Sequence, residues 1–265
     1  MCYSRPVSSA DQETPLAPAP ATGGAGPTAG PEPTRRADRL ASLIEVIVCS
    51  GFPTQLVVML ALGTLGLQPF VSSSQLSLRY VTLLSLADTA LLLGLVLFFL
   101  RVRGDDPRGL FFGARRAWPE ATLGLLWVPI VFLVVGALSL LITRALPWLR
   151  NVPENPLASL LQRPFDIAVF AFVAVVAGGV REEFQRAFIL DRFERHLGGA
   201  TVGLVLFSFV FGLGHALQGW DATVLTAALG AIWGALYLWR RSVVAPLVCH
   251  AAFNLAEVAH HAIAG

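Results

Sequence analysis

The chain has 265 residues, a formal net charge of +2, 55% hydrophobic residues and only 14% charged residues. A soluble domain usually carries about 25% charged residues, so this composition argues against a soluble protein and favours one embedded in lipid. The small net charge also argues against nucleic acid as a partner, because nucleic-acid-binding surfaces are strongly basic.

The N-terminal segment differs in composition from the rest of the chain. Residues 1–40 are rich in Pro, Ala, Gly, Ser and Thr and show no apolar period. Such a segment cannot bury enough apolar surface to offset the entropy that is lost on ordering. We therefore expect residues 1–40 to be a disordered tail and residues 41–265 to form a single transmembrane domain.

Long apolar segments follow from residue 41 onward. A helix that crosses a bilayer needs about 20 mostly apolar residues, so the pattern predicts an all-α, polytopic helix bundle of about seven spans. The expected spans are approximately 42–67, 79–100, 121–146, 165–190, 200–218, 222–239 and 243–262. The segment 147–164, which contains Pro and Asn, can hold a short eighth helix.

The distribution of arginine predicts the orientation of these spans. Short loops that face the cytoplasm carry an excess of basic residues. Arginines gather before the first span and after spans two, four and six, at Arg35, Arg36, Arg39, Arg101, Arg103, Arg108, Arg115, Arg116, Arg192, Arg195, Arg240 and Arg241. We expect an integral protein of the bacterial inner membrane with a cytoplasmic N-terminus.

Ionisable side chains occur inside the predicted spans, where they are costly unless they face a protein interior or a hydrated cavity. They form three groups: Arg181-Glu182-Glu183-Phe184-Gln185-Arg186 in the fourth span, Phe211 with His215 in the fifth, and His250 with Asn254 in the seventh. Taken singly, each group also fits a charged helix end or a hydrogen-bonded packing residue. One shared polar pocket explains all three groups together, so we expect these side chains to converge.

Helical spacing gives the first group a chemical interpretation. Arg186 is four residues after Glu182 and three after Glu183, so it can neighbour either carboxylate on a helix. One carboxylate can pair with Arg186 while the other stays free as a general base for water. Glu45 and Asp88, which lie in the first two spans, receive no role from the pattern.

In this order, the three groups resemble the signature motifs of the CPBP family of intramembrane peptidases, which includes CAAX prenyl proteases and bacteriocin-processing or self-immunity proteins. The family pattern is a Glu-Glu pair followed by Arg, then Phe-x-x-x-His, then His-x-x-x-Asn, and the resemblance covers residues 165–260. It implies a glutamic-type intramembrane endopeptidase. The implied partners are a membrane-associated or lipid-modified peptide or protein substrate and the lipid bilayer.

The resemblance implies an active site made of Glu182, Glu183, Arg186, His215, His250 and Asn254. In the favoured version no cofactor takes part. Glu182 activates water with the help of His215, and His250 and Asn254 stabilise the developing oxyanion. Arg186 orients the Glu pair. In the alternative version His215, His250 and Glu182 bind zinc, which activates the water.

The first motif is one residue shorter than the family's usual EExxxR, since this chain reads EExxR. If the Glu pair is the anchor, Glu182 is the catalytic carboxylate and Glu183 the second choice. If Arg186 is the anchor, Glu182 takes the second Glu position and Arg181 the first. A helix turns about 100° per residue, so the two alignments bring different side chains into the pocket.

Two alternatives lie outside the peptidase class. The shortened motif also fits a non-catalytic immunity or scaffold protein on the same fold. Buried ionisable groups also fit a transporter, in which they mark an ion path. No pair of interrupted spans in corresponding halves of the chain supports a transporter built from inverted repeats.

Overall fold

The structure, a computed structural model, describes residues 33–72, 75–153 and 155–264, and this part of the chain is all-helical without strands. The α-helices are α1 Pro33–Val48, α2 Phe52–Thr64, α3 Leu78–Arg103, α4 Pro107–Phe112, α5 Ala117–Ala145, α6 Pro164–Val173, α7 Glu182–His196, α8 Ala200–Leu213, α9 Trp220–Arg240 and α10 Val244–Ala264. The expected all-α class is therefore confirmed.

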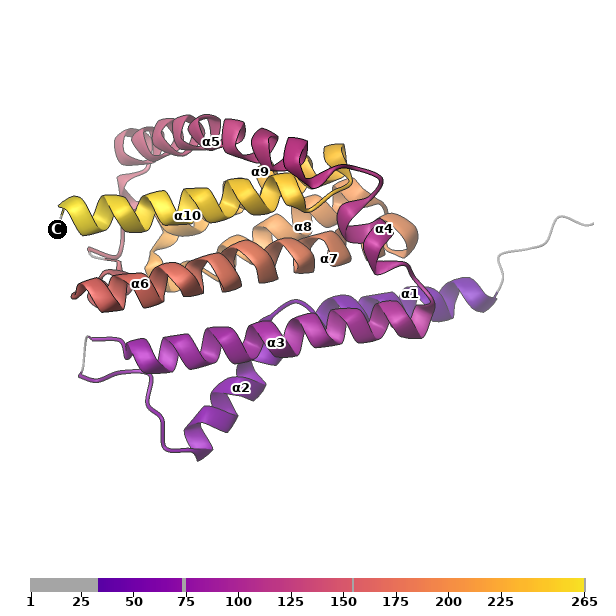
Figure 1. Ribbon diagram of the computed structural model, residues 1–265, viewed down its shortest axis with the longest axis horizontal. Helices are drawn as coiled ribbons and strands as arrows, with labels where there is room; N and C mark the ends of the chain where they lie inside the picture. The colour runs from indigo at the N-terminus through magenta and orange to yellow at the C-terminus, as the bar shows by residue number, and fades with distance from the viewer. Residues whose placement is uncertain (1–32, 73–74, 154, 265) are drawn as a thin grey trace, which may run out of the picture.

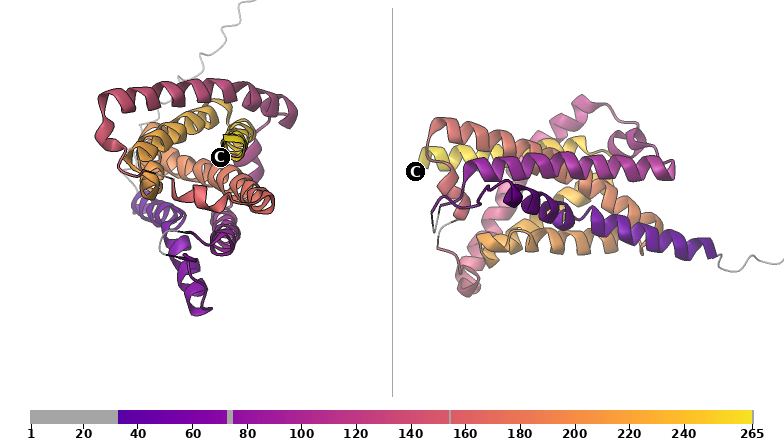
Figure 2. Two further views of the ribbon diagram at one scale, coloured as in Figure 1. Left: turned by 90° about the vertical axis from the view of Figure 1, so that its left-hand side faces the viewer. Right: turned by 90° about the horizontal axis from the view of Figure 1, so that it is seen from below.

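The long helices form a bundle along one axis. Figure 1 shows α10, the α6–α7 helix and α3 with nearly parallel axes, while α2 projects away from the bundle. In the left view of Figure 2, α5 crosses over one side of the bundle and covers α9 and α10. The C-terminus lies at the same end as the start of α6, and the start of α1 lies at the opposite end.

The structure contains fewer helices that could span a membrane than the sequence pattern predicted. Four helices of the described residues are long and apolar enough to cross a bilayer: α3, α5, the continuous helix Pro164–His196, and α9. The pair α1 and α2, bent by 43°, can count as a fifth span. The expected count of seven is not confirmed, since α8 has only 14 residues and α10 is not among these helices.

The structure also bears on two predictions outside the spans, those for the N-terminal tail and for the segment 147–164. Residues 1–32 of the predicted disordered tail lie outside the described residues, but α1 begins at Pro33, so the end of that segment is helical. Proline is tolerated in the first turn of a helix, where its missing N–H has no partner to lose. The segment 147–164, where a short extra helix was expected, holds two short 3₁₀ helices, η1 Pro147–Leu149 and η2 Pro156–Leu160.

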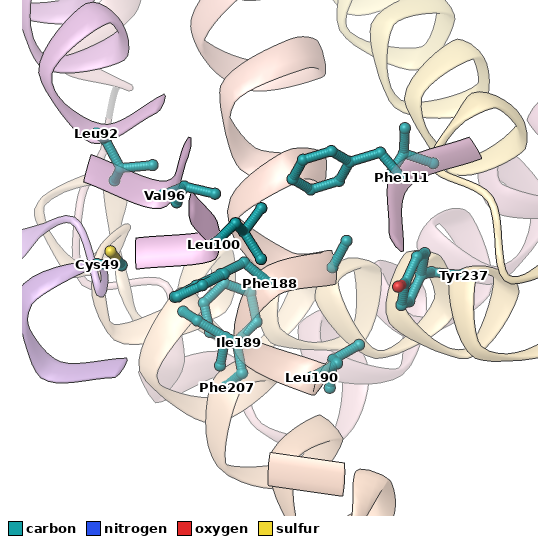
Figure 3. Close-up of a cluster of buried hydrophobic side chains, with 12 residues drawn as sticks. Cys49, Leu92, Val96, Leu100, Phe111, Phe188, Ile189, Leu190, Phe207 and Tyr237 are labelled. Carbon is teal, nitrogen blue, oxygen red and sulfur yellow. The ribbon is translucent and has the colours of Figure 1, made fainter. Parts of the chain in front are cut away.

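Helix α7 is the hub of the hydrophobic core. Four consecutive residues, Ala187 to Leu190, are almost fully buried, so neighbours surround this helix on every side. Figure 3 shows side chains of α3, α4, α8 and α9 packed around Phe188, Ile189 and Leu190. This packing fixes the start of α7, where the Glu pair is located.

Ion pairs join the opposite end of α7 to its neighbours. The buried Arg192 donates to Glu45 on α1 at 2.6 Å and lies 2.7 Å from Asp105. Glu45 also accepts from Arg103 at 2.6 Å. Burial raises the pKa of Asp105, but the hydrogen bonds and charges of Arg192 and Arg195 outweigh it and hold the pKa below its usual range. A buried guanidinium needs such partners, so Glu45 has a structural role.

Candidate active site

A π-helix precedes the Glu pair. α6 continues without a break into η3, the π-helix Ala174–Arg181, which leads directly into α7. π-Helical turns are rare and occur frequently at functional sites. Each π turn takes one residue more than an α turn, so this segment changes the face on which the following residues emerge. A sequence pattern with α-helical spacing gives no signal for it.

Two glycines of the π-helix allow α10 to approach closely. A Cβ atom on Gly178 would lie 2.5 Å from Nδ2 of Asn254, and one on Gly179 would lie 3.0 Å from Cβ of Ala251. The Asn254 amide donates to the carbonyl oxygen of Ala174 at 3.3 Å. The missing side chain at Gly178 therefore makes the space that the Asn254 amide occupies.

Glu183 and Arg186 form a buried pair behind the site. Their exposed fractions are 1% and 0%. Nη1 of Arg186 donates to Oε1 of Glu183, and the same oxygen lies 2.8 Å from Nδ1 of His250. Charges buried this deeply persist only when they are paired. Glu183 is thus held between a guanidinium and an imidazole.

An aromatic cage surrounds the guanidinium of Arg186. Its Cζ atom lies 5.0 Å from the ring centroid of Phe211 and 5.7 Å from that of Trp233, within the range of cation–π attraction. Trp233 also stacks on His250, with ring centroids 3.6 Å apart and planes 16° apart. Trp233 was not among the residues predicted from the sequence, where it is one more apolar residue in an apolar span.

Glu182 occupies a different environment from Glu183. It lines a cavity of about 760 Å³ together with Ala174 and Gly178, which lie on the same side of the helix. Its Oε1 atom is 3.4 Å from Nη2 of Arg181, and its Oε2 atom is 3.8 Å from Nε2 of His250. Glu182 therefore has only long contacts and faces open space.

The other predicted residues also meet at this cavity. His215, His250 and Asn254 line it with Glu182, while its walls are mainly apolar, with Leu161, Phe170, Leu225, Leu229 and Phe253 among them. The structure thus brings four of the six predicted side chains to one chamber. Glu183 and Arg186 are not on its surface and contact it through His250 and the aromatic cage.

The hydrogen-bond partners of the two histidines define how each ring can act. Nδ1 of His215 lies 3.0 Å from the carbonyl oxygen of Phe211, which can only accept, so Nδ1 carries the hydrogen. A neutral His215 then has a lone pair on Nε2. By the same argument the Glu183 carboxylate assigns a hydrogen to Nδ1 of His250, which can donate from Nε2 only as an imidazolium.

The predicted zinc ligands do not assemble into a metal site. Among the described residues, no group of three or more His, Cys, Asp or Glu side chains is placed to hold a metal ion. A catalytic zinc ion normally has three protein ligands and one open position. Glu182, His215 and His250 are donor types that zinc accepts and they share the cavity, but they are not gathered closely enough to form such a group.

Comparison with known proteins gives one match. Residues 164–256 match the family model described as Type II CAAX prenyl endopeptidase Rce1-like. This segment, about a third of the chain, is similar to the Rce1-like family. The match contains all six predicted site residues and confirms the resemblance seen in the three motifs. No curated protein and no solved structure matches the chain.

Similarity to the Rce1-like family indicates a protease, and that family acts on membrane-associated proteins. The long apolar helices agree with an integral membrane protein. The Rce1-like segment comprises α6, η3 and α7 to α10.

Proposed function

We propose that the protein is a glutamic-type intramembrane endopeptidase that hydrolyses a peptide bond in a lipid-modified, membrane-associated protein. The observation that carries this proposal is the contrast between the two adjacent glutamates. Glu183 is locked by Arg186 and His250, whereas Glu182 faces a cavity that it shares with His215 and Asn254. The Rce1-like match over residues 164–256 supports the same reaction class.

Glu182 is the general base of the proposed reaction. Its carboxylate takes one proton from a water molecule in the cavity, and the lone pair on Nε2 of His215 accepts a hydrogen bond from the same water. The hydroxide attacks the substrate carbonyl carbon, and the carbonyl π electrons move to oxygen. Breakage of the C–N bond releases an amine, which takes the proton back from Glu182.

Asn254 and His250 stabilise the oxyanion that forms in this step. The Asn254 amide has two hydrogens and uses one on the carbonyl of Ala174, so the second is available to the oxyanion. His250 donates from Nε2 when it is an imidazolium, and Glu182 and Glu183 supply the counter-charge. Preorganised donors of this kind contribute strongly in a site that excludes water.

The cavity suits a substrate with an apolar part. Its volume of about 760 Å³ is within the range of small-molecule sites, roughly 300–1,000 Å³. Apolar walls can hold a prenyl chain or the aliphatic side chains of a CAAX sequence, while the polar residues meet the peptide bond. The arginine distribution supports the further proposal that the N-terminus is cytoplasmic in a bacterial inner membrane.

Peptide cleavage by the purified full-length chain in proteoliposomes tests the proposed function. The probe is an internally quenched peptide that ends in a farnesylated Cys-aliphatic-aliphatic-X sequence, and the same peptide without the farnesyl group is its control. We expect cleavage of the farnesylated peptide, with mass spectrometry giving the cleaved bond. Absence of cleavage of both peptides by folded protein would favour the non-catalytic alternative.

Removal of metal ions is expected to leave the cleavage rate within about twofold of its starting value, because the described residues provide no three-ligand site for zinc. The measurement combines the metal content of the purified protein with its activity after dialysis against EDTA. Zinc bound at one ion per chain and required for turnover would contradict this prediction.

A further inference from the structure

A second buried ion pair lies directly behind Glu182. Arg181, the last residue of the π-helix, pairs through Nη1 with Asp88 on α3. Nη2 of the same guanidinium is 3.4 Å from Oε1 of Glu182. Asp88 is 1% exposed and lies 93 positions before Arg181, outside the matched segment 164–256.

We propose that Asp88 is a positioning residue for the reaction, which acts through Arg181 on the carboxylate of Glu182. Asp88 holds one arm of the guanidinium, and the other arm directs the Glu182 carboxylate. This inference rests on the proposed function, in which Glu182 is the base.

The shape of the arginine side chain allows Asp88 to influence Glu182 through Arg181. The guanidinium is planar and presents its donors in a rigid fork, so a carboxylate that fixes one arm also fixes the direction of the other. Asp88 is itself held firmly, because α3 buries Leu92 and Val96 in the main core one and two turns later. The position of Arg181 is therefore set by a helix outside the Rce1-like segment.

Charge balance gives the pair a second effect. Arg181 and Arg186 bring two positive charges to a site with three carboxylates, those of Asp88, Glu182 and Glu183. Asp88 neutralises Arg181 and Glu183 neutralises Arg186. Without Asp88, the Arg181 guanidinium would lack its own carboxylate and would be free to move closer to Glu182.

The other ionisable groups around Glu182 do not replace Asp88. From α10, His250 lies 3.8 Å from Glu182 and Glu257 lines the same cavity. His215, which follows α8, lines the cavity as well. None of these groups forms a hydrogen bond or ion pair with Arg181, so among the described residues Asp88 is its buried partner from another helix.

Four variants test the inference with the farnesylated quenched peptide in proteoliposomes: Asp88→Asn, Arg181→Lys, Arg181→Gln and the double variant Asp88→Asn/Arg181→Gln. We expect Asp88→Asn to lower kcat by about 10- to 100-fold with KM within about twofold, since a small misplacement of a catalytic group costs this much. Arg181→Lys keeps the charge but loses the fork, and it should lower kcat similarly. The double variant should match Arg181→Gln within about twofold, because Asp88 acts only through Arg181.

Glu120→Gln is the matched control. Glu120 on α5 is equally buried and accepts from Arg240 on α9 at 2.6 Å, away from the cavity lining. This variant should lower the thermal unfolding temperature in detergent and leave kcat near the starting value.

Several outcomes would overturn the inference. An unchanged kcat in either Asp88→Asn or Arg181→Lys would contradict it. A fall in kcat of the double variant equal to the product of the falls in Asp88→Asn and Arg181→Gln would also contradict it. Glu182→Gln separates the two proposals. If Glu182→Gln is inactive and Asp88→Asn is fully active, only the positioning role fails, whereas an active Glu182→Gln removes the proposed function as well.

Discussion

Replacing Glu182 with glutamine is expected to lower kcat for peptide cleavage by roughly 10³-fold, because general base catalysis contributes about 10²–10⁴-fold. Glutamine has nearly the same shape as glutamate but cannot take a proton from water. Its contacts are few, since Glu182 has only the 3.4 Å contact to Arg181 and the 3.8 Å contact to His250. The variant should therefore fold normally and bind substrate with little change in KM.

Glu183→Gln is the matched control, since it makes the same chemical change one residue later. It removes the charge that faces the buried Arg186, so it should lower the thermal unfolding temperature far more than Glu182→Gln does. Full activity of Glu182→Gln, with a folded but inactive Glu183→Gln, would assign the base to Glu183. Full activity of both Glu182→Gln and His215→Ala would exclude a glutamate-dependent peptidase.

Much of this arrangement can be predicted from the sequence, because burying charge in an apolar span is costly. The groups at Glu182, His215, His250 and Asn254 lie on three different helical segments, yet each is too polar to face lipid. A common cavity was the simplest explanation, and the structure places all four on one. The helical segments themselves follow from their apolar composition.

The division of labour between Glu182 and Glu183 could not be predicted in the same way. Both residues lie within one helical turn of Arg186, so α-helical spacing alone leaves the choice open. The π-helix Ala174–Arg181 and the close approach of α10 at Gly178 decide which carboxylate meets the cavity. Both features depend on tertiary packing that leaves no periodic signal.

Contacts between residues that are far apart in the sequence could not be predicted either. Trp233 is one more apolar residue in its span, and Asp88 is visible as an ionisable residue of the second span but without a partner. Their contacts form only when α9 stacks on α10 and α3 meets the π-helix. The predicted span 200–218 was too long for a related reason. α8 ends at Leu213, between Gly212 and Gly214, which weaken the helix.

Arg186→Met is expected to destabilise the protein by about 3–5 kcal/mol, because Glu183 is fully buried and loses its guanidinium partner, keeping only the contact with His250. This loss is comparable with the whole stability of many domains, about 5–15 kcal/mol. We therefore expect a low yield of folded protein and a large fall in the thermal unfolding temperature, measured in detergent micelles.

The double variant Glu183→Gln/Arg186→Met should recover most of this stability. It removes both charges, and replacing a buried ion pair by uncharged groups of similar volume is often neutral. The glutamine oxygen can still accept the hydrogen that Nδ1 of His250 donates, so the imidazole keeps its partner. Recovery of folding without the ion pair would show that Glu183 and Arg186 depend on each other for their charge balance.

Arg241→Met is the matched control for the single variant. Arg241 also pairs with a carboxylate, that of Glu194 on α7, at 2.7 Å, but the two side chains are 54% and 37% exposed. Water can therefore solvate the Glu194 charge that remains, so this variant should cost about 1 kcal/mol or less. Equal losses in Arg241→Met and Arg186→Met, or no loss in either, would contradict the argument that burial makes Arg186 indispensable to the fold.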